Sequence, residues 1–202
     1  MKNITSIILL FVFILTGCSF LKKNQLENNI LKKTDEYYHL EGSKIYGKHN
    51  KYISDGGILE PKYVEDVDIE TFQVLGGGYA KDKNSAYLYD GYIRYIKDAD
   101  IETFTYVGNY FAKDKKQVYF KNKIIKNADP KTFNLFKDKE TNTPETNLSI
   151  SFFSRDKKNL YLYDKKINVE QNTFEVLSWK KAKDINNTYI LDMNKGELFI
   201  EK

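Results

Sequence analysis

The side chains best suited to chemistry in this chain are two pairs of carboxylates, Asp66 with Asp68 and Asp98 with Asp100. Paired carboxylates serve as acid and base in glycoside hydrolysis. Both pairs precede the same Ile-Glu-Thr-Phe run, however, and they therefore belong to a repeat, whereas a catalytic site normally occurs once in a chain. We interpret them as cap and turn residues. We predict no catalytic residue and no enzyme; a hydrolase is the less favoured alternative.

Patterns for metal or cofactor binding are also missing from the sequence. With one cysteine and two histidines, neither a thiolate cluster nor a histidine-based metal site is expected. The glycine run at 76–78 lacks the lysine and the helix of a phosphate-binding loop, and we interpret it as a turn. Asp82-Lys83-Asn84 begins like a calcium loop, but Tyr87 stands where such a loop needs glycine. We predict no metal and no cofactor.

Tyrosines are the candidate ligand-binding residues. The chain holds 16 Tyr and 13 Phe but only 1 Trp. Tyrosine rings stack on cations and anchor protein interfaces, and alternation along the expected strands places a recurring Tyr on a half-buried face with its hydroxyl in water. The candidates are Tyr87, Tyr89, Tyr161 and Tyr163. The same pattern also fits rings that only pack one repeat on the next, and this alternative stays open.

Charge places few restrictions on the partner. The chain has 32 basic and 28 acidic residues, a formal net charge of +4. So small an excess of lysine and arginine is typical of a solubilising surface rather than a nucleic-acid interface. We expect no nucleic-acid partner, and an unknown protein or glycan partner instead.

The N-terminus has the layout of a secretory signal. Lys2 precedes an unbroken apolar run from Ile7 to Leu15, which is too short to span a bilayer. Leu15-Thr16-Gly17-Cys18 resembles the bacterial lipobox, which implies a lipid on the sulfur of Cys18 and cleavage before it. We expect residues 1–17 to be a lipoprotein signal peptide. Residues 18–36 would form a lipidated tether, possibly with a short helix. The protein would be anchored to a membrane of the cell envelope on the exported side.

The rest of the chain repeats itself. An Asp followed at the fifth position by a Tyr marks each repeat, and each repeat also carries a Phe preceded by Thr. The Asp/Tyr pairs are Asp82/Tyr87, Asp114/Tyr119, Asp156/Tyr161 and Asp184/Tyr189, and the Phe residues are Phe72, Phe104, Phe133 and Phe174. Self-similarity with a period of about 30 residues indicates an array of one supersecondary unit.

Each repeat contains a helical signal, a turn and a hairpin. Asp before Thr-Phe predicts a capped helix of one or two turns that docks its Phe into a sheet. Asp90-Gly91 predicts a hairpin with a type I′ turn. The residues on either side of the recurring Tyr, such as Ala86 and Leu88, should be core. Tyr46-Gly47-Lys48-His49 resembles a degenerate copy of Tyr79-Ala80-Lys81-Asp82, as expected at the end of an array.

The predicted fold is therefore mainly β: about five antiparallel β-hairpin repeats over residues 37–202, with short helices between them and a polar surface insertion at 137–147. The repeated Lys-Asp-Lys-Asn-Ser-Ala-Tyr (81–87) and the Asp-x-x-Thr-Phe segments resemble the DKNYY family of exported or lipid-anchored bacterial proteins, over roughly 45–202. The resemblance implies a β-rich repeat domain at the cell surface and no catalytic residue. We expect a surface-anchored binding or protein-interaction lipoprotein, or alternatively a glycan- or cell-wall-binding one.

Overall fold

The fold was analysed in a computed structural model. It describes residues 37–47, 53–54, 57–58, 63–136, 152–178 and 180–201. Cys18 and the segments expected to be a signal peptide (1–17), a tether (18–36) and a surface insertion (137–147) lie outside the described residues. Within the described part of the chain, no helix is long and apolar enough to cross a membrane.

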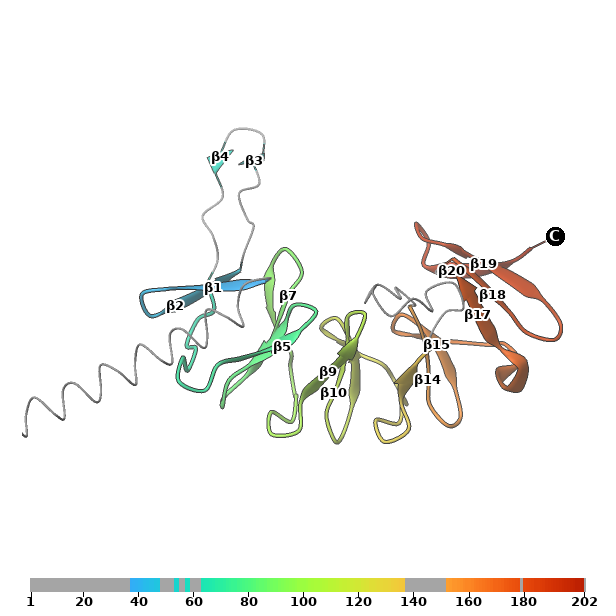
Figure 1. The fold of residues 1–202 in the computed structure, drawn as a ribbon, viewed down its shortest axis with the longest axis horizontal. Helices are drawn as coiled ribbons and strands as arrows, with labels where there is room; N and C mark the ends of the chain where they lie inside the picture. The colour runs from blue at the N-terminus through green and yellow to red at the C-terminus, as the bar shows by residue number, and fades with distance from the viewer. Residues whose placement is uncertain are drawn as a thin grey trace, which may run out of the picture.

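The repeat domain is a row of antiparallel sheets, and the mainly β prediction is confirmed. Four of the sheets are four-stranded meanders in which each strand pairs with the next along the chain. Figure 1 shows them following one another along the molecule in chain order. We call them units 2 to 5. Unit 2 holds β5 (Gln73–Gly76), β6 (Tyr79–Lys81), β7 (Ala86–Tyr89) and β8 (Ile93–Tyr95); unit 3 holds β9 (Thr105–Gly108), β10 (Phe111–Lys113), β11 (Val118–Phe120) and β12 (Lys123–Ile124); unit 4 holds β13 (Asn134–Leu135), β14 (Phe153–Arg155), β15 (Leu160–Leu162) and β16 (Lys165–Ile167); unit 5 holds β17 (Glu175–Ser178), β18 (Lys181–Lys183), β19 (Thr188–Asp192) and β20 (Glu197–Ile200).

A partial unit 1 begins the array. It consists of β1 (Tyr38–Glu41), β2 (Lys44–Gly47) and an isolated bridge from Tyr46 to Tyr63. Tyr38, rather than Tyr46, matches Tyr79: the Tyr38 hydroxyl donates to the Gly78 carbonyl of the next unit, as the Tyr79 hydroxyl does to the Tyr110 carbonyl. The expected copy at 46–49 is therefore displaced, and His49 lies outside the described residues. A small hairpin, β3 (Ile53–Ser54) with β4 (Gly57–Ile58), follows β2.

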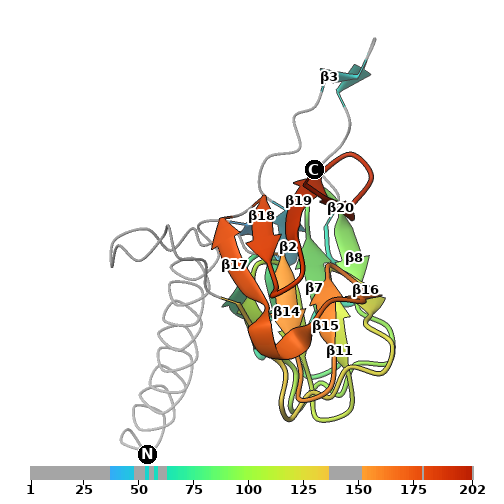
Figure 2. The same cartoon turned by 90° about the vertical axis from the view of Figure 1, so that its right-hand side faces the viewer.

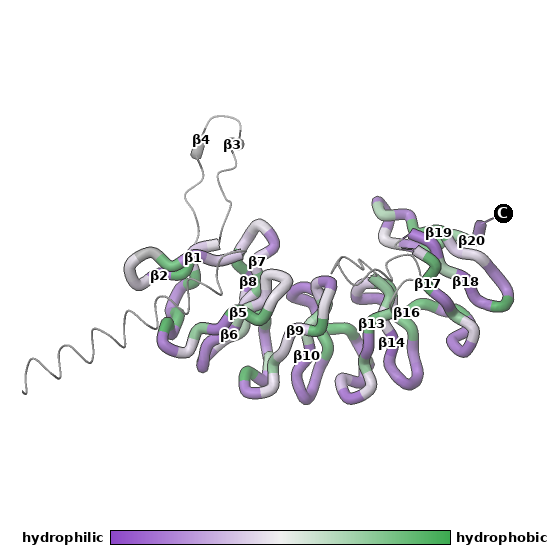
Figure 3. The backbone as a smooth tube through the Cα atoms, in the orientation of Figure 1, coloured by the Kyte–Doolittle hydropathy of each residue, from purple (hydrophilic) through white to green (hydrophobic). Residues whose placement is uncertain are grey.

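The hydrophobic core is a series of contacts between neighbouring units. One cluster joins Tyr79 and Leu88 of unit 2 to Phe104 and Tyr119 of unit 3, and another joins Phe153 and neighbours of unit 4 to unit 5. Viewed along the row, β7, β11 and β15 lie almost behind one another (Figure 2). Figure 3 shows hydrophobic stretches within the strands and hydrophilic residues in the turns. A central strand such as β7 is therefore buried on both faces, because each unit is covered on two sides.

The expected Phe core is confirmed, since Phe72, Phe104, Phe133 and Phe174 are all buried. The segments that carry them are shorter than the expected helices. They are single turns, such as the one closed by the hydrogen bond from Thr71 N to Asp68 O, and only Gln171–Thr173 (η1) is a 3₁₀ helix among the described residues. A few residues between two strands leave no room for a longer helix.

The hairpin after β7 also differs from the prediction. Tyr89 pairs with Ile93, so the loop has three residues, Asp90 to Tyr92, rather than the two of a type I′ turn. Of these three, only Gly91 has a positive φ, at 97°. One positive φ is compatible with a three-residue loop, whereas type I′ needs two.

One strand position distinguishes unit 5 from the units before it. The face that units 2 to 4 turn toward the next unit carries Tyr79, Phe111 and Phe153 at equivalent strand positions, and unit 5 carries Lys181 there. Its ammonium pairs with the Glu201 carboxylate at 2.7 Å. The pairing register places Ile190 and Phe199 on the same face, which is therefore mixed in character.

Candidate functional site

The recurring Asp is the centre of a hydrogen-bond network. In unit 3 the Asp114 side chain is only 3% exposed. One carboxylate oxygen accepts from the backbone N–H groups of Lys116 and Gln117, at 2.6 and 2.7 Å. The other accepts from the Tyr119 hydroxyl at 2.7 Å and the Asp100 N–H at 2.8 Å. A buried carboxylate is stable only with such partners, and this one has four.

The other three units build the same network. The Tyr hydroxyl donates to the recurring Asp at 2.7–2.8 Å in each of them, and the preceding turn donates a backbone N–H to the same oxygen. The Thr before each Phe takes part as well: its hydroxyl accepts from the residue after the recurring Asp, as Thr71 does from Lys83 N at 3.0 Å. The spacing of Asp, Tyr, Thr and Phe is therefore explained by the fold.

In units 4 and 5 these bonds keep the carboxylate ionised. Burial raises the pKa of the Asp184 carboxyl, but hydrogen bonds from Glu170, Tyr189, Asn186 and Asn187 outweigh it and hold the pKa at about 2. The Asp156 carboxyl is affected in the same way: its pKa is lowered despite burial. A group with so low a pKa is a hydrogen-bond acceptor at neutral pH and no proton donor.

The carboxylate pairs are caps, as expected. Asp68 accepts from the backbone N–H of Thr71 at 3.0 Å and from its hydroxyl at 2.7 Å. Asp100 holds Thr103 in the same way and also pairs with Lys115 at 2.9 Å. The hydrogen bond from Lys115 is the main reason why the pKa of Asp100 is lowered to about 2. The side chains of Asp68 and Asp100 are thus engaged in closing turns.

The four tyrosine candidates do not share a half-buried face: three of them are buried, which agrees with the open alternative that the rings pack one repeat on the next. Tyr87 and Tyr161 are each 1% exposed and Tyr89 is 7% exposed. The Tyr87 and Tyr161 hydroxyls are held by buried carboxylates. Tyr163 is half-buried, packs on Phe152 and donates to the Met193 sulfur at 3.4 Å. The alternation of residues along the strands did not indicate that units stack on both sides of a sheet.

The glycine run is a turn, as expected, and it brings two units close together. Gly76, Gly77 and Gly78 link β5 to β6 with positive φ angles of 117°, 56° and 82°. A Cβ on Gly77 would lie 2.6 Å from the Tyr106 ring of unit 3. The run therefore serves contact between units, which no other residue type would permit.

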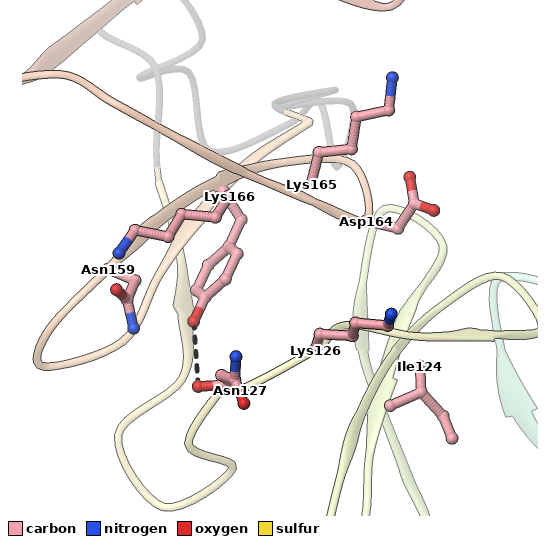
Figure 4. Close-up of a pocket in the computed structure, with 8 residues that line it drawn as sticks. Ile124, Lys126, Asn127, Asn159, Asp164, Lys165 and Lys166 are labelled. Carbon is pink, nitrogen blue, oxygen red and sulfur yellow. Dashed lines mark hydrogen bonds between the residues drawn. The ribbon is translucent and has the colours of Figure 1, made fainter.

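A cleft between units 3 and 4 is the best candidate for a ligand site (Figure 4). It encloses about 420 Å³, within the usual range of small-ligand sites. Lys126 and Asn127 come from the turn that leaves unit 3, and Asn159 and Lys166 come from unit 4. The full lining is Ile124, Lys126, Asn127, Asn159, Tyr161, Asp164, Lys165 and Lys166. In Figure 4 the Lys166 ammonium lies beside Asn159, the Lys126 side chain extends in the other direction, toward the side of Ile124 and Asp164, and Lys165 extends away from both.

The cleft lies beside a strand position whose residue differs from unit to unit. In β8 the residue opposite the recurring Tyr is Tyr95, whose ring packs on Tyr87 at 5.3 Å and whose hydroxyl donates to the Glu65 carbonyl. The same position is Ile124 in β12 and Lys166 in β16. A flexible lysine leaves open the space that an aromatic ring fills between units 1 and 2. Sequence reasoning missed this site, although aligning the last strands of the repeats would have singled out Lys166.

A second cleft lies between units 4 and 5 and encloses about 410 Å³. Its lining is largely aliphatic, with Leu162, Ile167 and Val169 from unit 4 and Leu198 and Ile200 from unit 5. Lys165 and Lys166 line both clefts. Within the described ranges no group of three or more His, Cys, Asp and Glu side chains is placed to hold a metal ion.

Comparisons with known proteins found no matching family model, no matching curated protein and no matching solved structure.

Proposed function

We propose that this chain is a lipid-anchored, exported bacterial protein whose repeat array is a scaffold for ligand binding, as its resemblance to the DKNYY family also implies. The ligand binds in the cleft between units 3 and 4 and not on a tyrosine face. The observation that carries the proposal is this cleft itself, whose lining holds three lysines that make no hydrogen bond or ion pair with the described residues. A concave site of this size suits a glycan or another small or chain-like ligand better than a flat protein surface.

The anchor rests on the Leu15-Thr16-Gly17-Cys18 pattern. Because a single thioether-linked diacylglycerol supplies two acyl chains, it gives stable anchoring. We expect wild-type protein in the membrane fraction and Cys18→Ser in a soluble or unprocessed pool. Mass spectrometry of the N-terminal peptide checks this directly, and a wild-type peptide without lipid mass would contradict the anchor.

Binding is tested with the full-length protein, purified in detergent and sedimented with isolated cell-wall material. We expect the double variant Lys126→Ser/Lys166→Ser to bind at least about tenfold more weakly, a loss of about 1.4 kcal/mol. The control is Lys97→Ser/Lys157→Ser, which removes the same charge from exposed positions that do not line the cleft.

Both double variants should melt at the wild-type temperature, because none of the four lysine side chains is engaged in a hydrogen bond or ion pair within the described part of the chain. Equal binding by the two variants, or no binding by wild type, would contradict the proposed site.

A further inference from the structure

The cleft between units 3 and 4 differs from its counterparts in charge as well as in shape. The turn that leaves each unit holds one residue in the left-handed conformation: Asp66 at φ 51°, Asp98 at φ 59° and Asn127 at φ 62°. The first two are acidic and Asn127 is neutral. Lys166 adds a positive charge where the earlier units place Tyr95 and Ile124. The equivalent turn residues are Glu65 and Asp66 between units 1 and 2 and Lys97 and Asp98 between units 2 and 3, whereas Lys126 and Asn127 carry no acid here.

Four polar side chains that line this cleft are donors without a partner in the part of the chain that the structure describes. Among the described residues, no hydrogen bond or ion pair engages the ammonium groups of Lys126, Lys165 and Lys166. The Asn127 carboxamide is equally free, since only its backbone carbonyl accepts, from Tyr161 at 3.4 Å. The one carboxylate in the lining, Asp164, lies 3.8 Å from Lys123 outside the cleft.

Other lysines of the array are used differently. Lys83 and Lys115 pair with the cap residues Asp68 and Asp100, and Lys81 and Lys113 donate to turn carbonyls of the next unit. Lys97 and Lys157 are unengaged as well, but the cleft is lined by three unengaged lysines, Lys126, Lys165 and Lys166. Exposed lysines are ordinarily hydrated, but these lie around one cavity together with an amide donor.

We infer that this cleft binds a phosphate group of its ligand. This inference rests on the proposed function and names the ligand chemistry. A phosphate presents oxygens in tetrahedral directions and accepts hydrogen bonds from several sides, as the donors from units 3 and 4 would require. A planar carboxylate is better matched by the fork of an arginine, and no arginine lines the cleft.

The test uses the full-length protein in detergent, with inorganic phosphate, pyrophosphate and glycerol phosphate as probes and ³¹P line broadening as the readout. We expect binding that weakens as sodium chloride increases, because screening acts on exposed charges. Lys126→Ser and Lys166→Ser should each weaken it about tenfold. Lys97→Ser, at the position in unit 2 that corresponds to Lys126, should stay within about twofold of wild type.

A second variant should fill the cleft while the fold stays intact. In Lys166→Tyr the new ring should fill the space in unit 4 that is equivalent to the one Tyr95 fills in unit 2. Its hydroxyl should donate to the Lys126 carbonyl, as the Tyr95 hydroxyl donates to the Glu65 carbonyl at 3.0 Å. We expect this variant to melt no lower than wild type and to lose phosphate binding. If Lys126→Ser or Lys166→Ser failed to fold, Lys166→Tyr would still test the inference.

Competition by carboxylates separates the two anion classes. Malonate and citrate should compete with glycerol phosphate at least about tenfold more weakly than pyrophosphate does. Equal competition by malonate would overturn the phosphate assignment, and so would phosphate binding that Lys166→Tyr leaves intact. If no phosphate probe binds while sedimentation with cell-wall material still depends on Lys126 and Lys166, the phosphate inference fails and the proposed function stands. If neither depends on these lysines, both fail.

Discussion

Replacing Asp114 with alanine should lower the free energy of unfolding by about 4 kcal/mol, one of the largest effects available in this chain. The change leaves the buried Tyr119 hydroxyl and the Asp100 N–H without an acceptor. Each orphaned donor costs about 1–3 kcal/mol, and the turn also loses two bonds. Urea unfolding followed by circular dichroism measures the loss.

A matched control exists in the same protein. Asp192 also accepts two backbone N–H groups, from Asn194 and Lys195, but it is the last residue of β19, is only partly buried, and accepts from no tyrosine among the described residues. Asp192→Ala should cost no more than about 1 kcal/mol. An Asp114→Ala variant as stable as this control would show that the buried network contributes little.

Phe104→Ala should cost about 3–5 kcal/mol as a core truncation. Phe104 is 1% exposed and lies between Tyr79 of unit 2 and Tyr119 of its own unit, with ring centroids 5.9 and 5.7 Å away. The cavity would open at the contact between units, so the array should also unfold less cooperatively. Equilibrium unfolding in urea reports both the midpoint and the slope.

Phe199→Ala is the control for this truncation, because Phe199 is 42% exposed on the outer unit. It should cost less than about 1.5 kcal/mol, since little apolar area is removed from contact. A loss for Phe104→Ala no larger than for Phe199→Ala would mean that the Phe turns do not hold neighbouring units together.

The repeat and its core could be predicted because they rest on local spacing. Asp82 and Tyr87 are five positions apart and meet within one hairpin, and Phe72 precedes them. Equivalent residues recur in the same order in the other units, so the pattern is visible in a single sequence. Even the insertion after Phe136 leaves it intact: Asp129 N still donates to Asp156 at 3.0 Å. The insertion lies in the chain between β13 and β14, and these two strands still pair with each other.

The tyrosine face could not be judged from spacing alone. Alternation predicts two different faces when one side of a sheet meets water, but β7 is covered by a unit on each side, so Tyr87 and Leu88 are both buried. The cleft was hidden for another reason. Lys126 and Lys166 are distant in sequence. The pairing of Tyr161 with Lys166 shows that Lys166 stands where unit 2 has a space-filling ring, at the cleft that Lys126 also lines.

The assignment of the cleft depends on the claim that the recurring Asp/Tyr pairs hold the array together. Amide hydrogen exchange on the full-length protein tests it most directly, at the turn amides of Lys116 and Gln117, which donate to buried Asp114. We predict that they exchange only through global unfolding, as slowly as the strand amides of β10 and β11. The amides of Asn194 and Lys195, bound to Asp192, should exchange far faster. Equally fast exchange at both turns would contradict the claim.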